Sequence, residues 1–151
     1  MANYESIVCS NKFKVKKESI ENVRKALSYF EESCVDDEGN AIIASYGETL
    51  SDEIEVLMSK ATGEVVGSFD YSAQMAEDLL DVNENVDDYY SKGFQEFLQE
   101  NMLDGEHVFI KELGHEKFRY AISVGLLITK KLVRWIDLDV EAHEILEENE
   151  G

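Results

Sequence analysis

The chain has 151 residues, 44% of them hydrophobic and 31% charged, and its formal net charge is −19. This size suits a single domain spanning residues 1–151, and the charge argues against direct binding to nucleic acid or to an anionic membrane surface. No apolar run approaches the roughly 20 residues of a membrane span and no signal segment opens the chain, so we expect a cytoplasmic protein in which Cys9 and Cys34 stay reduced.

The first part of the chain predicts strands followed by one helix. Alternating side chains indicate strands over residues 3–8 and 13–15. Apolar residues at three- and four-residue steps predict a helix over about residues 18–33, with Ser19 as its N-cap. These apolar residues are Ile20, Val23, Leu27, Phe30 and Cys34. Cys34 is therefore expected to be a small buried hydrophobic residue rather than a reactive thiol.

Turn residues divide the next part of the chain into short strands. Residues 36–40 predict a loop, and residues 41–46 a short apolar strand. Residues 53–59 and 64–69 predict a β-hairpin around the turn between them. Ser72 is expected to cap a short helix, followed by a polar loop at 81–85. The apolar residues of that helix are Met75, Ala76, Leu79 and Leu80.

Residues 86–102 predict a longer helix, although Gly93 weakens the pattern. Asp87 and Asp88 fall in its first turn, where carboxylates suit the helix dipole. The residues expected on its inner side are Val86, Tyr90, Phe94, Phe97 and Leu98.

The longest alternation in the chain lies between Lys117 and Thr129, where every second residue is apolar. Strict alternation of this kind predicts a strand with one buried face. The pairs Gly114-His115 and Lys130-Lys131 are expected to be turns, which fold residues 108–113 and 132–138 back as antiparallel partners. The alternating residues are Phe118, Tyr120, Ile122, Val124, Leu126 and Ile128.

The order of the elements predicts an α+β fold. We expect a two-layer sandwich, in which an antiparallel sheet carries helices on one face around a ferredoxin-like core with extra strands. A last helix, capped by Asp139, is expected to turn Ala142, Ile145 and Leu146 toward this core.

The sequence contains no recognisable catalytic, metal or cofactor motif. Residues 81–87 place oxygen side chains at alternate positions, as a calcium loop does. However, Val86 and Lys92 occupy the positions that would need glycine and glutamate. The histidines have no partner ligand at zinc-site spacing. They are His107, His115 and His143. We therefore expect a non-enzymatic protein with no catalytic residue, no metal site and no cofactor.

The surplus negative charge is confined to the middle of the chain. Between Glu31 and Glu106 there are 21 acidic residues and only two basic ones, Lys60 and Lys92, whereas the remaining residues carry 12 of each sign. Duplex DNA carries about one charge per 1.7 Å of axis, so a surplus of this size matches about 32 Å of duplex. If these charges share one side of the domain, their density approaches that of DNA.

A surface of this kind would dock into the nucleic-acid-binding groove of a basic protein. The residues expected to form it are Glu77, Asp78, Asp81, Glu84, Asp87, Asp88, Glu96, Glu100 and Asp104.

Three alternatives stay open. The first is an acidic surface that is merely solvated and has no partner. The second is a homo-oligomeric or protein-interaction module, such as a homodimer, that pairs through sheet edges or an apolar patch. The third is a small enzyme that uses His115 or scattered carboxylates in a cleft.

Four stretches near the two ends of the chain carry a family resemblance. They read SNKFKVK from Ser10, LDGE from Leu103, GHEKFRY from Gly114 and ITK from Ile128. They resemble small acidic ferredoxin-like accessory proteins of conjugative plasmids, integrative elements and phages of Gram-positive bacteria. The resemblance implies a mobile-element protein that disarms a host restriction or CRISPR system by DNA mimicry. It assigns a role to no individual residue.

Overall fold

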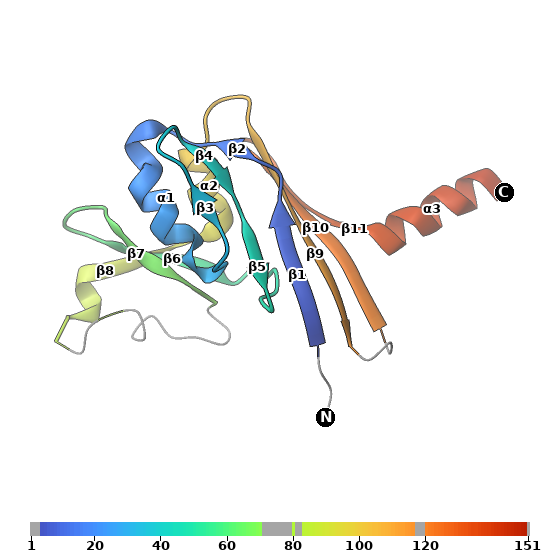
Figure 1. Cartoon of the computed structure of the whole chain (residues 1–151), viewed down its shortest axis with the longest axis horizontal. Coiled ribbons are helices and arrows are strands. Elements are labelled where there is room, and N and C mark those ends of the chain that lie inside the picture. The colour runs from blue at the N-terminus through green and yellow to red at the C-terminus, as the bar shows by residue number, and fades with distance from the viewer. Residues whose placement is uncertain (1–3, 71–79, 81–82, 117–119, 151) are drawn as a thin grey trace.

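The computed structural model describes residues 4–70, 80, 83–116 and 120–150. Helices and antiparallel strands are combined in it, so the predicted α+β class is confirmed (Figure 1). The helix predicted after Ser72 and the predicted inward position of Phe118 lie outside the described residues.

A five-stranded antiparallel sheet forms one side of the molecule, in the order β11-β10-β9-β1-β5. The predicted meander is confirmed, because β10 lies between β9 and β11 and the Lys130-Lys131 turn separates β10 from β11. The strands are β1 Tyr4–Ser10, β5 Ala44–Tyr46, β9 His107–Glu116, β10 Tyr120–Thr129 and β11 Val133–Asp137.

The turn predicted at Gly114-His115 is wrong. Both residues continue β9 and pair with Ser6 and Glu5 of β1. The ladder to β1 supplies backbone hydrogen bonds along this part of β9, and this keeps the chain extended where glycine alone would suggest a turn.

Two smaller sheets complete the strands of the described residues, with the orders β2-β4-β3 and β7-β6-β8. The hairpin predicted over 53–59 and 64–69 is confirmed as β6 and β7. The strand predicted over 41–46 is divided between β4 and β5, which belong to different sheets. A ferredoxin-like core in a two-layer sandwich is not confirmed by this arrangement. The strands are β2 Phe13–Lys14, β3 Cys34–Val35, β4 Asn40–Ile42, β6 Ile54–Ser59, β7 Val65–Asp70 and β8 Tyr89–Gly93.

The helix predicted over 18–33 is shorter than expected. It consists of α1, Ile20–Ala26, between the 3₁₀ turns η1, Lys17–Ser19, and η2, Leu27–Tyr29. Ser19 is the N-cap residue, as predicted, but its hydroxyl makes no capping hydrogen bond.

Cys34 is exposed, so its predicted burial is wrong. The backbone becomes extended at Phe30, where φ is −100° and ψ is 92°, and Cys34 therefore lies in β3 rather than on the helix. Side chains alternate along a strand, and it is Val35 that takes the buried side.

The first half of the helix predicted over 86–102 is wrong. Residues Val86–Asp88 form the 3₁₀ turn η4 and the next five form β8, so that only α2, Phe94–Asn101, is an α-helix. The β8 backbone pairs with β6, and this ladder and the β-prone tyrosines outweigh the helical spacing of the apolar residues. Val86 and Tyr90 are consequently exposed, while Phe94, Phe97 and Leu98 are buried as predicted.

The hydrophobic core lies between the five-stranded sheet and the two helices α1 and α2 (Figure 1). Leu126 and Ile128 are buried, which confirms the predicted inner face of β10 for these residues. The sheet contributes Val8, Val108, Ile110, Leu126 and Ile128, and the helices contribute Val23, Ala26, Phe94, Phe97 and Leu98.

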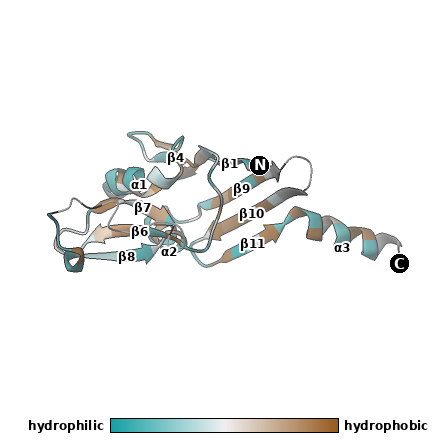
Figure 2. Cartoon of the chain, turned by 90° about the horizontal axis from the view of Figure 1, so that it is seen from below, coloured by the Kyte–Doolittle hydropathy of each residue, from teal (hydrophilic) through white to brown (hydrophobic). Residues whose placement is uncertain are grey.

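The last helix, α3, Leu138–Glu150, does not join this core. The prediction that Ala142, Ile145 and Leu146 face inward is wrong, because all three are exposed. The helix starts directly after the last residue of β11, so the chain has no loop with which to fold back onto its own sheet. Figures 1 and 2 both show α3 projecting away from the rest of the molecule.

Candidate partner-binding surface

Six of the nine candidate acidic residues lie in the described part of the chain. They fall on η4, on α2 and on the loops that flank these elements: Glu84, Asp87, Asp88, Glu96, Glu100 and Asp104. The other three candidates, Glu77, Asp78 and Asp81, lie outside the described residues.

Asp87 and Asp88 are exposed at the start of β8, where η4 presents them. The side chain of Asn85 fixes this turn, because its Oδ1 accepts a hydrogen bond from the Asp87 backbone N–H at 3.1 Å. Beside the turn, the Tyr89 hydroxyl donates to Glu84, and this hydrogen bond raises the pKa of Tyr89. The loop therefore holds three carboxylates together at one end of β8.

β8 also brings an acidic residue of β6 to this surface. Glu55 pairs with Gly93 in the ladder, and its carboxylate accepts a hydrogen bond from the Ser91 hydroxyl at 3.2 Å. Glu55 was not among the predicted site residues. Because residues 86–93 were interpreted as a helix, no sequence pattern placed Glu55 beside this segment.

α2 presents two further carboxylates, because its apolar residues occupy the opposite side of the helix. Glu96 and Glu100 are one helical turn apart and exposed. The ammonium group of Lys92 lies 2.6 Å from Glu100 Oε2, and this hydrogen bond raises the pKa of Lys92. One of the two basic residues of the acidic segment is therefore paired within this surface.

Asp52 connects α2 to the edge of the large sheet. Its Oδ1 accepts hydrogen bonds from Gln95 Nε2 at 3.0 Å and from Trp135 Nε1 at 2.7 Å. Like Glu55, it was missed, since its neighbours on α2 and β11 are remote in sequence. We call the carboxylates of β6, α2, residue 52 and the loop before β8 the acidic surface: Asp52, Glu55, Glu84, Asp87, Asp88, Glu96 and Glu100.

The charge density of the acidic surface lies below that of DNA. β8 and α2 have five and eight residues and together extend at most about 28 Å. Two lysines offset two of the seven negative charges. They are Lys92 and Lys60, and the backbone N–H of Lys60 donates to the Asp88 carbonyl. The net negative charge that remains corresponds to about one charge per 6 Å of this length, compared with about one charge per 3.4 Å along a single DNA strand.

Asp104 lies apart from the acidic surface, in the turn after α2, and pairs with Lys130 at 3.5 Å. The two residues line a wide, open cavity of about 730 Å³, which also includes His107, Leu127 and Lys131. Within the described residues, no cluster of three or more histidines, cysteines or carboxylates could hold a metal ion. His143 pairs with Glu147 on α3, and His107 and His115 belong to β9.

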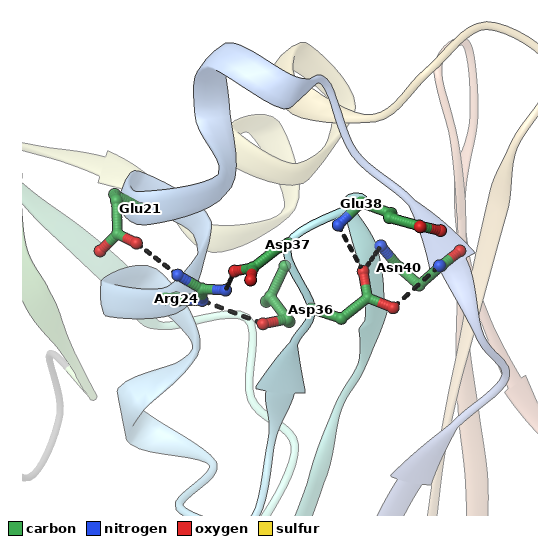
Figure 3. A network of polar contacts seen from close by, with 7 residues as sticks. Glu21, Arg24, Asp36, Asp37, Glu38 and Asn40 are labelled. Atoms are coloured by element: carbon green, nitrogen blue, oxygen red, sulfur yellow. Dashed lines mark hydrogen bonds and ion pairs between the residues drawn. The ribbon is translucent and has the colours of Figure 1, made fainter.

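A second acidic group lies beside α1, and two of its carboxylates bond to Arg24 (Figure 3). Arg24 bonds to Glu21 and, at 2.9 Å, to Asp37, and these contacts, Asp37 first, raise the pKa of Arg24. The Asp36 carboxylate accepts 2.9 Å hydrogen bonds from the backbone of Glu38 and from both the side chain and backbone of Asn40. These hydrogen bonds, those from Asn40 first, lower the pKa of Asp36. Some acidic residues of the middle segment therefore lie beside α1, apart from the acidic surface.

No protein-family model, curated protein or solved structure matches this chain. Among the described helices, none is both long and apolar enough to cross a membrane. The case for a function therefore depends on the geometry and charge of the acidic surface.

Proposed function

We propose that this protein is a non-enzymatic inhibitor that binds the basic nucleic-acid-binding site of another protein and blocks it. One observation supports the proposal most directly: β6, α2, residue 52 and the loop before β8 carry seven carboxylates, and the contacts among the described residues place two lysines, Lys60 and Lys92, beside them. A partner that binds phosphates through lysine and arginine would meet a comparable array of anions here.

The expected partner is a host defence protein of the restriction or CRISPR type, encountered in the cytoplasm. This part of the proposal draws on the resemblance of the chain ends to accessory proteins of plasmids and phages. The net charge of −19 would also speed the encounter with a basic partner by electrostatic steering. No catalytic residue, metal or cofactor takes part. The ferredoxin-like core and the two-layer sandwich stay predictions, and the proposal does not depend on them.

Capture of partners from a host lysate tests this proposal. The full chain is immobilised at low salt, and bound proteins are released either with duplex DNA or with an equal mass of a neutral polymer. We expect the captured proteins to be nucleic-acid-binding proteins, and we expect DNA but not the neutral polymer to release them. Retention of the partner in the presence of excess DNA would contradict the proposal.

Charge reversal locates the binding surface. Asp87→Lys/Asp88→Lys is compared with Glu31→Lys/Glu32→Lys, a second pair of adjacent, exposed acidic residues that lies outside the acidic surface. Both variants change the net charge equally. We expect only the first to lose the partner, with unchanged circular dichroism in both. Equal loss in both variants would show that total charge, rather than this surface, determines binding.

A further inference from the structure

We infer that two copies of this chain form a dimer in which α3 of each copy packs on the outer face of the partner's five-stranded sheet. This outer face is the side opposite α1 and α2, and its residues are distinct from those of the acidic surface. The inference therefore stands or fails independently of the proposed function.

The first observation is an apolar stripe on α3. Leu138, Ala142 and Leu146 recur at four-residue steps, so they share one side of the helix. All three are exposed, and Leu138 and Leu146 are 45% and 56% exposed. An isolated helix of this length is marginal in water. Figure 2 shows hydrophobic residues along the projecting helix, a pattern that packing against another surface would account for.

The second observation is the way in which α3 is attached. β11 ends at Asp137 and α3 begins at the next residue. The Asp137 carboxylate accepts hydrogen bonds from the backbone N–H groups of Asp139 at 3.0 Å and Val140 at 3.3 Å, and this capping fixes the direction in which the helix leaves. Without a connecting loop, α3 cannot reverse onto its own sheet. The described part of this chain therefore leaves the stripe uncovered.

The third observation is an apolar outer face on the same sheet. Tyr46, Ile7 and Leu113 form a cross-strand row over β5, β1 and β9, and they are 75%, 49% and 53% exposed. Phe109 and Leu127 continue this face on β9 and β10. Gly125 also lies on this face, beneath the ring of Phe109.

Gly125 allows the ring of Phe109 to lie across β10. A Cβ at position 125 would be only 2.3 Å from the Phe109 ring. The ring therefore fills the space above the glycine and covers part of β10 with an apolar side chain. An apolar sheet face of this kind is the usual packing partner of an amphipathic helix.

Charge complementarity identifies the occupant as α3 of a second copy. The helix carries acidic residues and no lysine or arginine: Asp139, Glu141, Glu144, Glu147, Glu148 and Glu150. The outer face carries two exposed basic residues, Lys111 on β9 and Arg134 on β11, and one exposed acidic residue, Glu5 on β1. An acidic helix with one apolar stripe fits an apolar face with these two basic side chains.

A two-fold arrangement uses both surfaces of both copies and leaves neither helix uncovered.

Sedimentation equilibrium of the full chain and three single variants tests the inference. We expect the wild type to have a mass of about 34 kDa, twice the 17.2 kDa of one chain. Leu146→Asp on the helix stripe and Leu113→Asp on the outer face should each weaken dimerisation about tenfold or more. Val140→Asp is the matched control, because Val140 is 53% exposed but lies on the opposite side of α3, and it should stay dimeric.

A monomeric wild type at micromolar concentrations would overturn the inference, as would a dimer that survives either Leu146→Asp or Leu113→Asp. Circular dichroism of each variant checks that the fold is retained.

Crosslinking distinguishes helix-on-sheet packing from other dimers. In a Cys9→Ser/Cys34→Ser background, Leu113→Cys and Leu146→Cys chains are mixed and oxidised. We expect a disulfide only between the two different chains. A disulfide between two Leu113→Cys chains would indicate sheet-on-sheet pairing, and one between two Leu146→Cys chains would indicate helix-on-helix pairing. Either result would overturn the inference.

Discussion

At the residue scale, the outer face of the large sheet depends on one close contact. Gly125 has no side chain, and the ring of Phe109 occupies the space that one would need. Any larger residue must push this ring away from β10.

Gly125→Ala is therefore expected to lower the free energy of unfolding by about 1–3 kcal/mol, as overpacking does elsewhere. Urea denaturation measures the change. Ser123→Ala, on the same face of the same strand, is the control and should change stability by less than about 0.5 kcal/mol. A Gly125→Ala variant with the same free energy of unfolding as the wild type would show that the Phe109 ring moves aside without loss of stability.

Asp36 organises the β3–β4 turn through three hydrogen bonds that require its carboxylate to be ionised. Because the pKa of Asp36 is lowered on folding, its contribution to stability is present above the ordinary aspartate pKa of about 3.9 and is lost as the pH falls through the folded value. Asp36→Asn should thus be less stable than the wild type at neutral pH, and the difference should disappear in acid.

Urea midpoints measured from neutral to acidic pH test this expectation. Glu38→Gln, on the same turn, is the control and should follow the wild type throughout. If the difference in urea midpoint between the wild type and Asp36→Asn stays constant with pH, the charge of the Asp36 carboxylate does not contribute to stability.

At the element scale, α2 determines which residues reach the acidic surface. Phe97 is 2% exposed in the core, and Glu96 next to it points to solvent. Phe97→Ala should cost about 3–5 kcal/mol of unfolding free energy, while Glu96→Ala should change it by less than about 0.5 kcal/mol. Similar effects of the two substitutions would mean that α2 is oriented differently and does not present Glu96 and Glu100 together.

The sequence predicted those elements whose pattern and partners are close together in the chain. The β9-β10-β11 meander and the β6–β7 hairpin follow from alternation and local turns, and both are confirmed. The segment 86–93 could not be predicted in this way, because its strand character comes from pairing with β6, about 35 residues earlier. Asp52 and Glu55 were missed from the candidate site for the same reason.

Cys34 and α3 show a second limit of periodicity. Cys34 continues the apolar spacing of α1, but the helix ends before it and the side chain is exposed. The stripe on α3 was interpreted as facing the core because an apolar face needs a partner, yet the direct connection to β11 prevents the chain from supplying one. Spacing identifies an apolar face but not which molecule covers it.

At the scale of the whole molecule, acidic residues gather in more than one place. Around Arg24, Glu21 and Asp37 bond to the guanidinium and Asp36 holds a turn, whereas the acidic surface combines seven carboxylates with two lysines. Salt should affect the two proposed interactions differently. Binding to a basic partner weakens as salt rises, while the apolar contacts of the dimer persist and the repulsion between two acidic chains is screened.

The salt dependence of partner binding tests the central claim most directly. For a captured partner, affinity is measured at about 50 mM and about 200 mM salt, with the wild type, Asp87→Lys/Asp88→Lys and Glu31→Lys/Glu32→Lys. We expect wild-type affinity to fall by roughly 100- to 500-fold over this range, because about five charges are neutralised on binding. The Glu31/Glu32 variant should behave similarly, and the Asp87/Asp88 variant should bind weakly with little dependence on salt. A wild-type affinity that does not change with salt, or an Asp87/Asp88 variant with the wild-type slope, would contradict the account.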